Sequence, residues 1–281
     1  MNRFLERTLT VVVALAMTGC ATNRTGSRAP LNANLAATVE ASDPRLRDAL
    51  LAEAIAPSPS THLEVAREYA RLGILDAAHS RTARAISLQP ASPMAHEFMA
   101  RIWRDWGLPS LGLGPAHRAV AFAPQSASAR NTLGTVFDAL GQDGEARTAY
   151  QVAIRLDPGA SWALNNLCYL EFRLGRLDQA RRQCEAALRV TPSLTTAQNN
   201  LGLTHAASGD MRGASLAFFA GGDEAAAHYN LGIVLLAAGR YPQAANAFEQ
   251  AIAARPDFTA AKRWAHDARM RALPVHKDHD E

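Results

Sequence analysis

The chain has 281 residues, of which 48% are hydrophobic, 6% aromatic and 20% charged, and its formal net charge is +3. Alanine accounts for 58 residues, and because alanine is the best helix former and a poor strand former, the composition argues against a β-sandwich or a β-barrel. The chain is too hydrophobic and too weakly charged for wholesale disorder, and a net charge of +3 gives no sign of nucleic-acid binding.

The first twenty residues have the features of a secretion signal. Arg3 and Arg7 form a short basic start, and the apolar run Leu9–Met17 follows them. This run is too short to span a bilayer but fits the hydrophobic region of a signal peptide. It ends in Met17-Thr18-Gly19-Cys20, which resembles the lipobox of bacterial lipoproteins.

The lipobox resemblance implies that residues 1–19 are a lipoprotein signal peptide. Cleavage before Cys20, diacylation of its thiol and acylation of the new N-terminus, with palmitate as an expected group, would anchor the chain to a membrane. Ala21 follows the cysteine where an aspartate would imply retention in the inner membrane, so the resemblance implies the periplasmic face of the outer membrane. An ordinary cleaved signal with an incidental cysteine is the alternative.

The next segments are a linker and a short helix. Residues 20–42 comprise the acylated cysteine and a small, polar, aperiodic stretch that predicts a flexible tether. Residues 43–58 predict a short N-terminal helix and a turn, because Asp43 is a helix cap, Pro44 suits a first turn, and Pro57-Ser58-Pro59-Ser60 stops the helix.

The rest of the chain repeats with a period of 34 residues. Prolines keep this interval at Pro90, Pro124, Pro158 and Pro192, and Pro256 follows 64 residues later, which is one interval of 34 and one of 30. Glycines keep the same interval at Gly73, Gly107, Gly141, Gly175 and Gly209, and Gly239 follows after 30. In each unit two amphipathic helical stretches flank the glycine, and the proline closes the second stretch.

A 34-residue helix–turn–helix unit with a Leu-Gly pair, an aromatic residue, the pattern A-x₃-F and a closing proline resembles the tetratricopeptide repeat (TPR). The third unit shows the pattern best, with Leu133-Gly134, Phe137, Gly141, Ala146, Tyr150, Ala153 and Pro158. The resemblance covers Pro59 to about Phe258. It implies an all-α, right-handed TPR α-solenoid of about six helix–turn–helix repeats.

The period sets the expected boundaries. The six units are 59–92, 93–126, 127–160, 161–194, 195–224 and 225–258, and they are followed by a capping helix over 259–273 and a polar tail over 274–281. The second unit has Gly112 and Ala116 in its A-x₃-F positions. The fifth unit is shortened because it ends four residues early at Gly221-Gly222-Asp223, so we expect a shortened second helix there.

The sequence contains none of the catalytic motifs that short patterns reveal. No lysine precedes Lys262, so a Walker A loop is excluded, and no HExxH, nucleophile elbow or CxxC pair is found. His62, His96 and His228 share one repeat column and cannot converge on a single metal ion. We therefore expect no enzymatic activity, no metal, no cofactor and no small-molecule substrate.

Two cysteines follow Cys20. Cys168 occupies the small Gly position of the fourth unit's first helix, and Cys184 occupies the aromatic position of its second helix. Both positions face the contact between these two helices. An oxidising periplasm permits a disulfide here, and two free buried thiols that pack as small hydrophobic groups are the alternative.

The resemblance implies a peptide-binding site, because the first helices of TPR arrays line a concave groove. Transferred to this sequence, the groove positions are Arg67, Arg71, Arg101, Arg104, Asn131, Trp162, Asn165, Tyr169, Phe172, Asn199, Leu203, Tyr229 and Ile233. Asparagines can hydrogen-bond an extended backbone, aromatic residues offer apolar pockets, and arginines can take carboxylates. Alternatively, the arginines are only solvated and Tyr229 and Ile233 pack on the C-terminal helix.

Two neighbouring asparagines have a different expected role. Asn200 and Asn230 lie beside the groove column, and we expect them to form hydrogen bonds between helices.

Two functions remain open at this point. The signal, lipobox, tether and repeats resemble the architecture of pilotin-like TPR lipoproteins of type IV and Flp/Tad pilus or secretin systems. This resemblance implies a scaffold for protein binding that assists pilus assembly or secretion through a protein or peptide partner, such as a secretin segment. The alternative is an accessory subunit of a cell-envelope or cell-wall enzyme complex.

Overall fold

The computed structural model describes residues 42–273, and every regular element within them is an α-helix. The predicted signal peptide, Cys20, residues 21–41 and the tail over 274–281 lie outside the described residues. Helix–helix contacts divide the described chain into two compact units, residues 42–163 and residues 164–273. No helix of this described stretch is long and apolar enough to cross a membrane.

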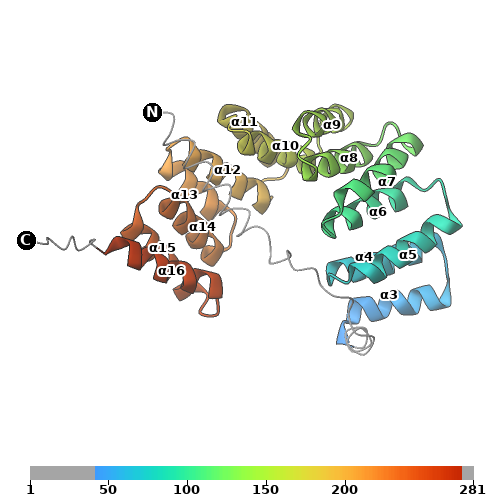
Figure 1. The fold of residues 1–281 in the computed structure, drawn as a ribbon, viewed down its shortest axis with the longest axis horizontal. Helices are drawn as coiled ribbons and strands as arrows, with labels where there is room; N and C mark the ends of the chain where they lie inside the picture. The colour runs from blue at the N-terminus through green and yellow to red at the C-terminus, as the bar shows by residue number, and fades with distance from the viewer. Residues whose placement is uncertain (1–41, 274–281) are drawn as a thin grey trace, which may run out of the picture. The chain divides into compact units, whose positions relative to one another are not determined.

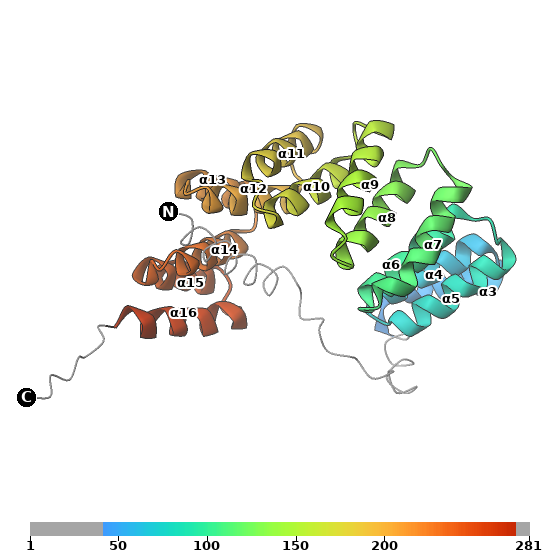
Figure 2. The same ribbon diagram turned by 45° about the horizontal axis from the view of Figure 1, so that its top comes forward.

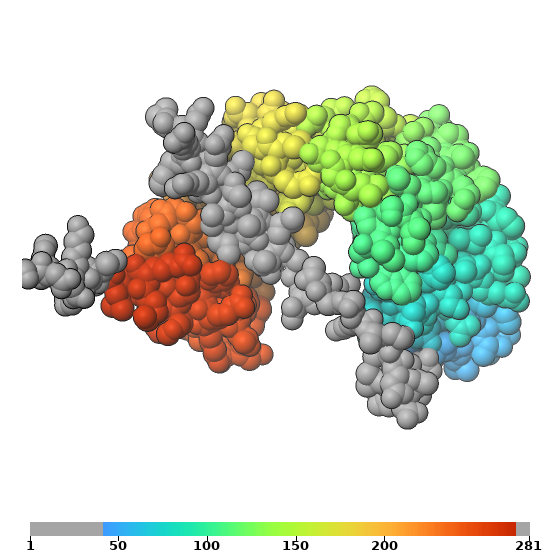
Figure 3. Space-filling view, viewed as in Figure 1, coloured from blue at the N-terminus to red at the C-terminus, as the bar shows by residue number. Residues whose placement is uncertain are grey.

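The first unit consists of one helix followed by three helix pairs. Its helices are α3 (Pro44–Ile55), α4 (Pro59–Arg71), α5 (Leu75–Leu88), α6 (Pro93–Asp105), α7 (Pro109–Phe122), α8 (Ala127–Ala139) and α9 (Asp143–Leu156). Each helix contacts the next one along the chain, and α6 also contacts α8 (Figures 1 and 2). The three pairs lie within the predicted units 59–92, 93–126 and 127–160, and Figure 3 shows them as neighbouring cyan and green parts of the molecule.

The second unit continues the same pattern. Helix α10 (Ser161–Arg173) runs across the boundary between the units, and the remaining helices are α11 (Leu177–Val190), α12 (Thr195–Ala207), α13 (Met211–Ala220), α14 (Glu224–Ala237), α15 (Tyr241–Ala254) and α16 (Thr259–Ala272). Helix α13 has 10 residues, whereas α11 and α15 have 14 each, so the predicted shortening of the fifth repeat is confirmed. Helix α16 packs on α15 where a capping helix was expected.

Local sequence explains where these helices begin and turn. The side chains of Ser58, Ser92 and Ser126 cap α4, α6 and α8 by accepting a backbone N–H bond from the first turn. Within each pair the turn contains one glycine of the 34-residue series, such as Gly141, whose φ of 72° lies in the left-handed region. Residues with a side chain disfavour this conformation, and the recurring glycines therefore mark the helix–helix turns.

Close contact between paired helices depends on a glycine under an aromatic ring. In the α8–α9 pair, Tyr150 is 1% exposed, and a Cβ atom added to Gly134 would lie 2.6 Å from Cε1 of this ring. Gly232 and Phe248 have the same relationship in the α14–α15 pair, again at 2.6 Å. The expectation that small residues let the paired helices approach closely is thus met by direct contact between ring and backbone.

The fourth repeat replaces this contact with a covalent bond. Cys168 of α10 and Cys184 of α11 form a disulfide with a Cα–Cα distance of 5.2 Å, and both are fully buried. Their sequence positions correspond to Gly134 and Tyr150 one repeat earlier. Of the two alternatives left open by the sequence, the structure has the disulfide.

Helix α3 is attached to the first repeat by apolar and charged contacts. Leu46 is fully buried, and Glu53 is 7% exposed although it carries a carboxylate. Glu53 Oε1 lies 2.5 Å from Nδ1 of His62 on α4, and Oε2 lies 3.2 Å from a guanidinium nitrogen of Arg81 on α5. Burying a carboxylate is costly unless it is paired, so these two partners stabilise the docked α3.

Candidate binding surfaces

The first helices α4, α6 and α8 share one face of residues 42–163, which we call the first-helix face. Arg67 Nη2 of α4 lies 3.0 Å from Sδ of Met94 on α6. The hydroxyl of Ser128 on α8 donates to Glu97 on α6 at 2.5 Å, and the hydroxyl of Thr132 donates to the same oxygen at 3.5 Å. These contacts connect α4 to α6 and α6 to α8, and Arg67 is the predicted groove position that takes part in them.

The four predicted arginines of this face have different surroundings. Arg71 bonds both Asp43 and Glu68 at 2.6 Å, and Arg104 bonds the adjacent Asp105 at 2.7 Å. Arg67 and Arg101 are exposed, and no carboxylate within residues 42–273 lies at ion-pair distance from either of them. Arg67 and Arg101 are therefore the cations that this face offers to a ligand.

Glu97 gives the first-helix face an acidic group with a raised pKa. Burial raises its pKa above the ordinary value, while the hydrogen bonds from Ser128 and Thr132 and the charge of Arg101 act in the opposite direction. The cation–π contact of Arg101 with the ring of Phe98, at 5.7 Å, adds an apolar element nearby. Sequence reasoning missed Glu97, although its position in the repeat is the one that Asn131 holds one repeat later.

The other predicted residues of this unit are accessible. Asn131 is half-buried on α8, and Trp162 at the start of α10 is 39% exposed. Neither residue is part of a buried core cluster, so both retain surface that a ligand can contact.

In residues 164–273, asparagine side chains connect successive first helices. Asn200 Nδ2 donates to Asn165 Oδ1 at 2.9 Å, and Asn230 Nδ2 donates to Asn199 Oδ1 at 3.2 Å. The predicted interhelical role of Asn200 and Asn230 is confirmed. Their acceptors, Asn165 and Asn199, are two of the predicted groove residues, and both are half-buried, as is the predicted groove residue Tyr169.

The four predicted groove residues not yet described lie in the protein interior. Phe172 is fully buried, and Leu203, Tyr229 and Ile233 are 5%, 6% and 3% exposed. The Tyr229 ring lies 4.9 Å from the ring of Phe258, at the start of α16, between ring centroids. For Tyr229 and Ile233, which cluster with Ala261 and Ala265 of α16, this packing is the alternative that the sequence left open. The burial of Phe172 and Leu203 was not expected, and all four side chains have little surface left for a ligand.

The repeated histidines have separate roles. His62 contacts Glu53, Nε2 of His96 lies 2.8 Å from the carbonyl oxygen of Pro90, and His228 packs edge-on against Phe219 at 4.8 Å. Throughout residues 42–273, no group of three or more histidine, cysteine, aspartate or glutamate side chains is arranged to hold a metal ion.

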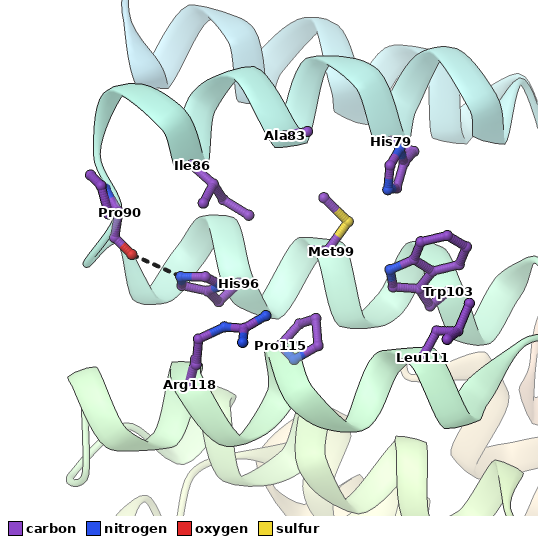
Figure 4. Close-up of a pocket in the computed structure, with 10 residues that line it drawn as sticks. All are labelled: His79, Ala83, Ile86, Pro90, His96, Met99, Trp103, Leu111, Pro115 and Arg118. Carbon is purple, nitrogen blue, oxygen red and sulfur yellow. Dashed lines mark hydrogen bonds between the residues drawn. The ribbon is translucent and has the colours of Figure 1, made fainter.

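A pocket that the sequence did not predict lies between α5 and α7. Its volume is about 560 Å³, and Figure 4 shows α6 forming its floor between these two second helices. The lining residues are His79, Ala83, Ile86, Pro90, His96, Met99, Trp103, Leu111, Pro115 and Arg118. Seven of these ten are neither arginine nor histidine, none is acidic, and Arg118 is the one permanently charged residue among them.

One end of this pocket is aromatic. The indole of Trp103 stacks on that of Trp106 with centroids 5.5 Å apart, and His79 contacts Trp103 edge-on at 4.8 Å. Burial lowers the pKa of His79 below its ordinary value, so its imidazole is uncharged at neutral pH. The pocket is therefore apolar at the Trp103 end and cationic at the Arg118 end, as Figure 4 shows.

The degenerate second repeat has small residues around this pocket. Position 116 is alanine, whereas the corresponding Tyr150 fills the equivalent space in the third repeat with a ring. A Cβ added to Gly112 would lie 2.9 Å from the carbonyl oxygen of Ala100, so α7 also approaches α6 closely. The sequence signal was the loss of the aromatic residue together with two tryptophans, Trp103 and Trp106, in a single repeat.

Comparisons with known proteins agree with this fold. One family model described as a tetratricopeptide repeat matches residues 225–258, and a second with the same description matches 116–161 and 167–227. None of the curated protein sequences compared with the chain matches it significantly.

Three solved structures illustrate the structural likeness. The APC/C hetero-tetramer Cut9-Hcn1 is 17% identical with a TM-score of 0.67, over 94% of this chain and 54% of the other, so this chain spans about half of that protein's length. The type IV pilus biogenesis factor PilW is 19% identical with a TM-score of 0.62, over 73% and 97%. The pilF protein of Pseudomonas aeruginosa is 18% identical with a TM-score of 0.57, over 74% and 97%.

The helix pairs and their turn glycines agree with the family matches and with the solved structures on the fold of this chain. The chain has an all-α fold built from tetratricopeptide repeats, a scaffold-type fold for protein–protein interaction.

Proposed function

We propose that this chain is a non-enzymatic scaffold that binds a segment of a protein partner and is anchored by acylated Cys20 to the periplasmic face of the outer membrane. Its role is to assist assembly of a pilus or a secretion complex, with a secretin or pilus component as the partner. This combines the repeat fold of residues 59–258 with the lipobox that precedes it.

The observation that carries partner binding is the pair of exposed cations on the first-helix face. Arg67 and Arg101 have no carboxylate at ion-pair distance in the described chain, although the charge of Arg101 acts on Glu97, and both project from helices that contact each other. Asn131 on the adjacent α8 can both donate to and accept from a peptide backbone. An acidic, extended segment of a partner fits this combination of groups.

Membrane anchoring is supported by the order of the N-terminal sequence features. The apolar run Leu9–Met17 leads directly into Met17-Thr18-Gly19-Cys20, and a polar tether follows. Each buried methylene of an acyl chain contributes about 0.8 kcal/mol, so a multiply acylated cysteine holds a protein on a membrane stably.

The pilus assignment is supported by fold alone. PilW and the P. aeruginosa pilF protein share the repeat fold over nearly their whole lengths. This likeness makes pilus and secretin components the first partners to test.

Photo-crosslinking in intact cells tests partner binding. A photoreactive amino acid at position 94, an exposed position in contact with Arg67, should capture a pilus or secretin component. The double variant Arg67→Glu with Arg101→Glu should reduce this capture at least tenfold. Arg155→Glu, an exposed arginine on the second helix α9, is the matched control. Unchanged capture by the double variant would contradict the site, and capture of a cell-wall enzyme would favour the accessory-subunit alternative.

Fractionation of cells tests the anchor separately. Cys20→Ser should move the chain from the outer-membrane fraction to the soluble periplasmic fraction or leave it unprocessed. If this variant is processed normally and stays in the outer membrane, the lipid anchor is wrong while partner binding at the first-helix face is unaffected.

A further inference from the structure

We infer that the pocket between α5 and α7, which we call the α5–α7 pocket, is a second docking site that takes a short partner segment carrying one carboxylate and one large apolar side chain. This goes beyond the first-helix face, because the second helices α5 and α7 form the walls of the pocket, and the α6 residues that form its floor, His96, Met99 and Trp103, are not among the residues described on that face. It rests on the proposed function only in assuming that the ligand is a protein.

Charge complementarity identifies the carboxylate. Arg118 is exposed, lines the pocket, and has no carboxylate at ion-pair distance in the described part of the chain. The lining contains no acidic residue, and the lowered pKa of His79 leaves that imidazole neutral at neutral pH. A single anionic group at the Arg118 end therefore balances the charge of the α5–α7 pocket.

The opposite end identifies the apolar side chain. Trp103, Leu111 and His79 surround it in Figure 4, while Met99 and Ile86 line the middle. Leu111 is 51% exposed although it is a large aliphatic residue, and Trp106, which stacks on Trp103, is 39% exposed. Apolar surface gathered in this way around a concave site is typical of a contact that buries it.

The spacing of the two ends sets the spacing within the ligand. His96 and Trp103 are seven residues apart on α6, as are Arg118 and Leu111 on α7, which corresponds to a rise of about 10 Å. Three residues of extended chain cover about 10 Å. A glutamate or aspartate placed three residues before a phenylalanine, tryptophan or leucine therefore reaches both ends.

A peptide fits this site better than a lipid does. Four of the lining residues, Ala83, Pro90, Leu111 and Arg118, are exposed, so an acyl chain in the pocket would remain largely in contact with water. A peptide needs to bury only its apolar side chain there, and its backbone can stay solvated.

The test uses a fluorescently labelled peptide with a glutamate three residues before a phenylalanine in a serine and glycine background. Binding to the full chain is followed by fluorescence anisotropy and should saturate below about 1 mM. Ala83→Trp fills the α5–α7 pocket from an exposed position on α5 and should weaken peptide binding at least tenfold. Ala253→Trp, the same change at an exposed position on α15, is the matched control and should leave binding unchanged.

A charge swap at Arg118 distinguishes a loss of peptide recognition from a loss of folding. Arg118→Glu should lose affinity for the glutamate peptide and gain affinity for the same peptide carrying lysine in its place. A merely unfolded variant would lose both. The double variant Arg67→Glu with Arg101→Glu should bind the glutamate peptide as the wild type does, because neither arginine lines the α5–α7 pocket. A failure of the peptide to bind at the α5–α7 pocket would therefore not count against partner binding at the first-helix face.

Three results would overturn the inference. They are absence of saturable binding up to about 1 mM, equal binding of the glutamate peptide by Arg118→Glu, and equal binding by Ala83→Trp. Dodecanoate is the probe for a lipid ligand. If it binds and is blocked by Ala83→Trp while the peptide does not bind, the α5–α7 pocket is a lipid site and the peptide inference is wrong.

Discussion

Gly134→Ala tests the idea that ring-to-backbone contact holds the paired helices together. The added methyl group would lie 2.6 Å and 2.7 Å from two ring carbons of Tyr150, well inside van der Waals contact. The ring cannot move away easily because Tyr150 is 1% exposed. Overpacking of this kind costs about 1–3 kcal/mol, and alanine regains about 1 kcal/mol in helix propensity. We expect a net loss of about 1 kcal/mol, and at most about 2 kcal/mol.

Urea unfolding followed by circular dichroism measures this loss. With a typical denaturant slope of about 2 kcal/mol per molar, the midpoint should fall by about 0.5 M. Gly144→Ala is the matched control, because nothing lies within 4 Å of a Cβ at that helical position, and it should be neutral or stabilising. Tyr150→Leu should restore much of the stability lost in Gly134→Ala. If Gly134→Ala is as stable as Gly144→Ala, the close contact does not limit helix pairing.

Three further predictions concern bonds that hold other elements. Reduction of the Cys168–Cys184 disulfide, which closes a sequence separation of 16, should lower the stability of its repeat by about 3 kcal/mol in urea unfolding, and an unchanged midpoint would contradict this. Glu53→Ala should release α3 at a cost of about 2 kcal/mol, seen as faster amide exchange in α3. Glu53→Gln removes the charge and keeps a side chain of similar size, so amide exchange in Glu53→Gln as slow as in the wild type would refute a role for the carboxylate charge. The hydrogen bond from a backbone N–H at the start of α14, and secondly the contact with Arg255, lower the pKa of Asp223 in the folded state. The Asp223 charge therefore stabilises the fold at pH values above the unfolded-state pKa of about 3.9. This stabilisation is lost as the pH falls through the lower pKa of the folded state. Wild type should therefore exceed Asp223→Asn in stability at neutral pH, and the two should converge in acid; a pH-independent difference would show that the charge plays no part.

The repeat architecture could be predicted because it is encoded locally. A glycine such as Gly141 is required wherever the turn between paired helices has a positive φ, and a proline such as Pro158 closes each unit, so two single-residue series located the helix pairs. The shortened α13 followed from the same count. Each of these features depends on neighbours within one repeat.

The candidate binding surfaces were predicted less well, because exposure depends on residues distant in sequence. Arg67 and Tyr229 lie in equivalent helices of their repeats, yet Arg67 is exposed and Tyr229 is buried against Phe258 of the next element. Glu97 was overlooked because its burial and its partners come from α8 as well as α6.

The sequence by itself determined that the chain is helical, that its unit is 34 residues long, and that the unit is a tetratricopeptide repeat, since helix propensity, turn glycines and apolar periodicity act over a few residues. Only the tertiary structure decided that Cys168 and Cys184 are bonded and that a pocket opens above Met99. Both depend on the distance between helices, which is set by how side chains from different segments fill the space between them, and no local pattern specifies that distance.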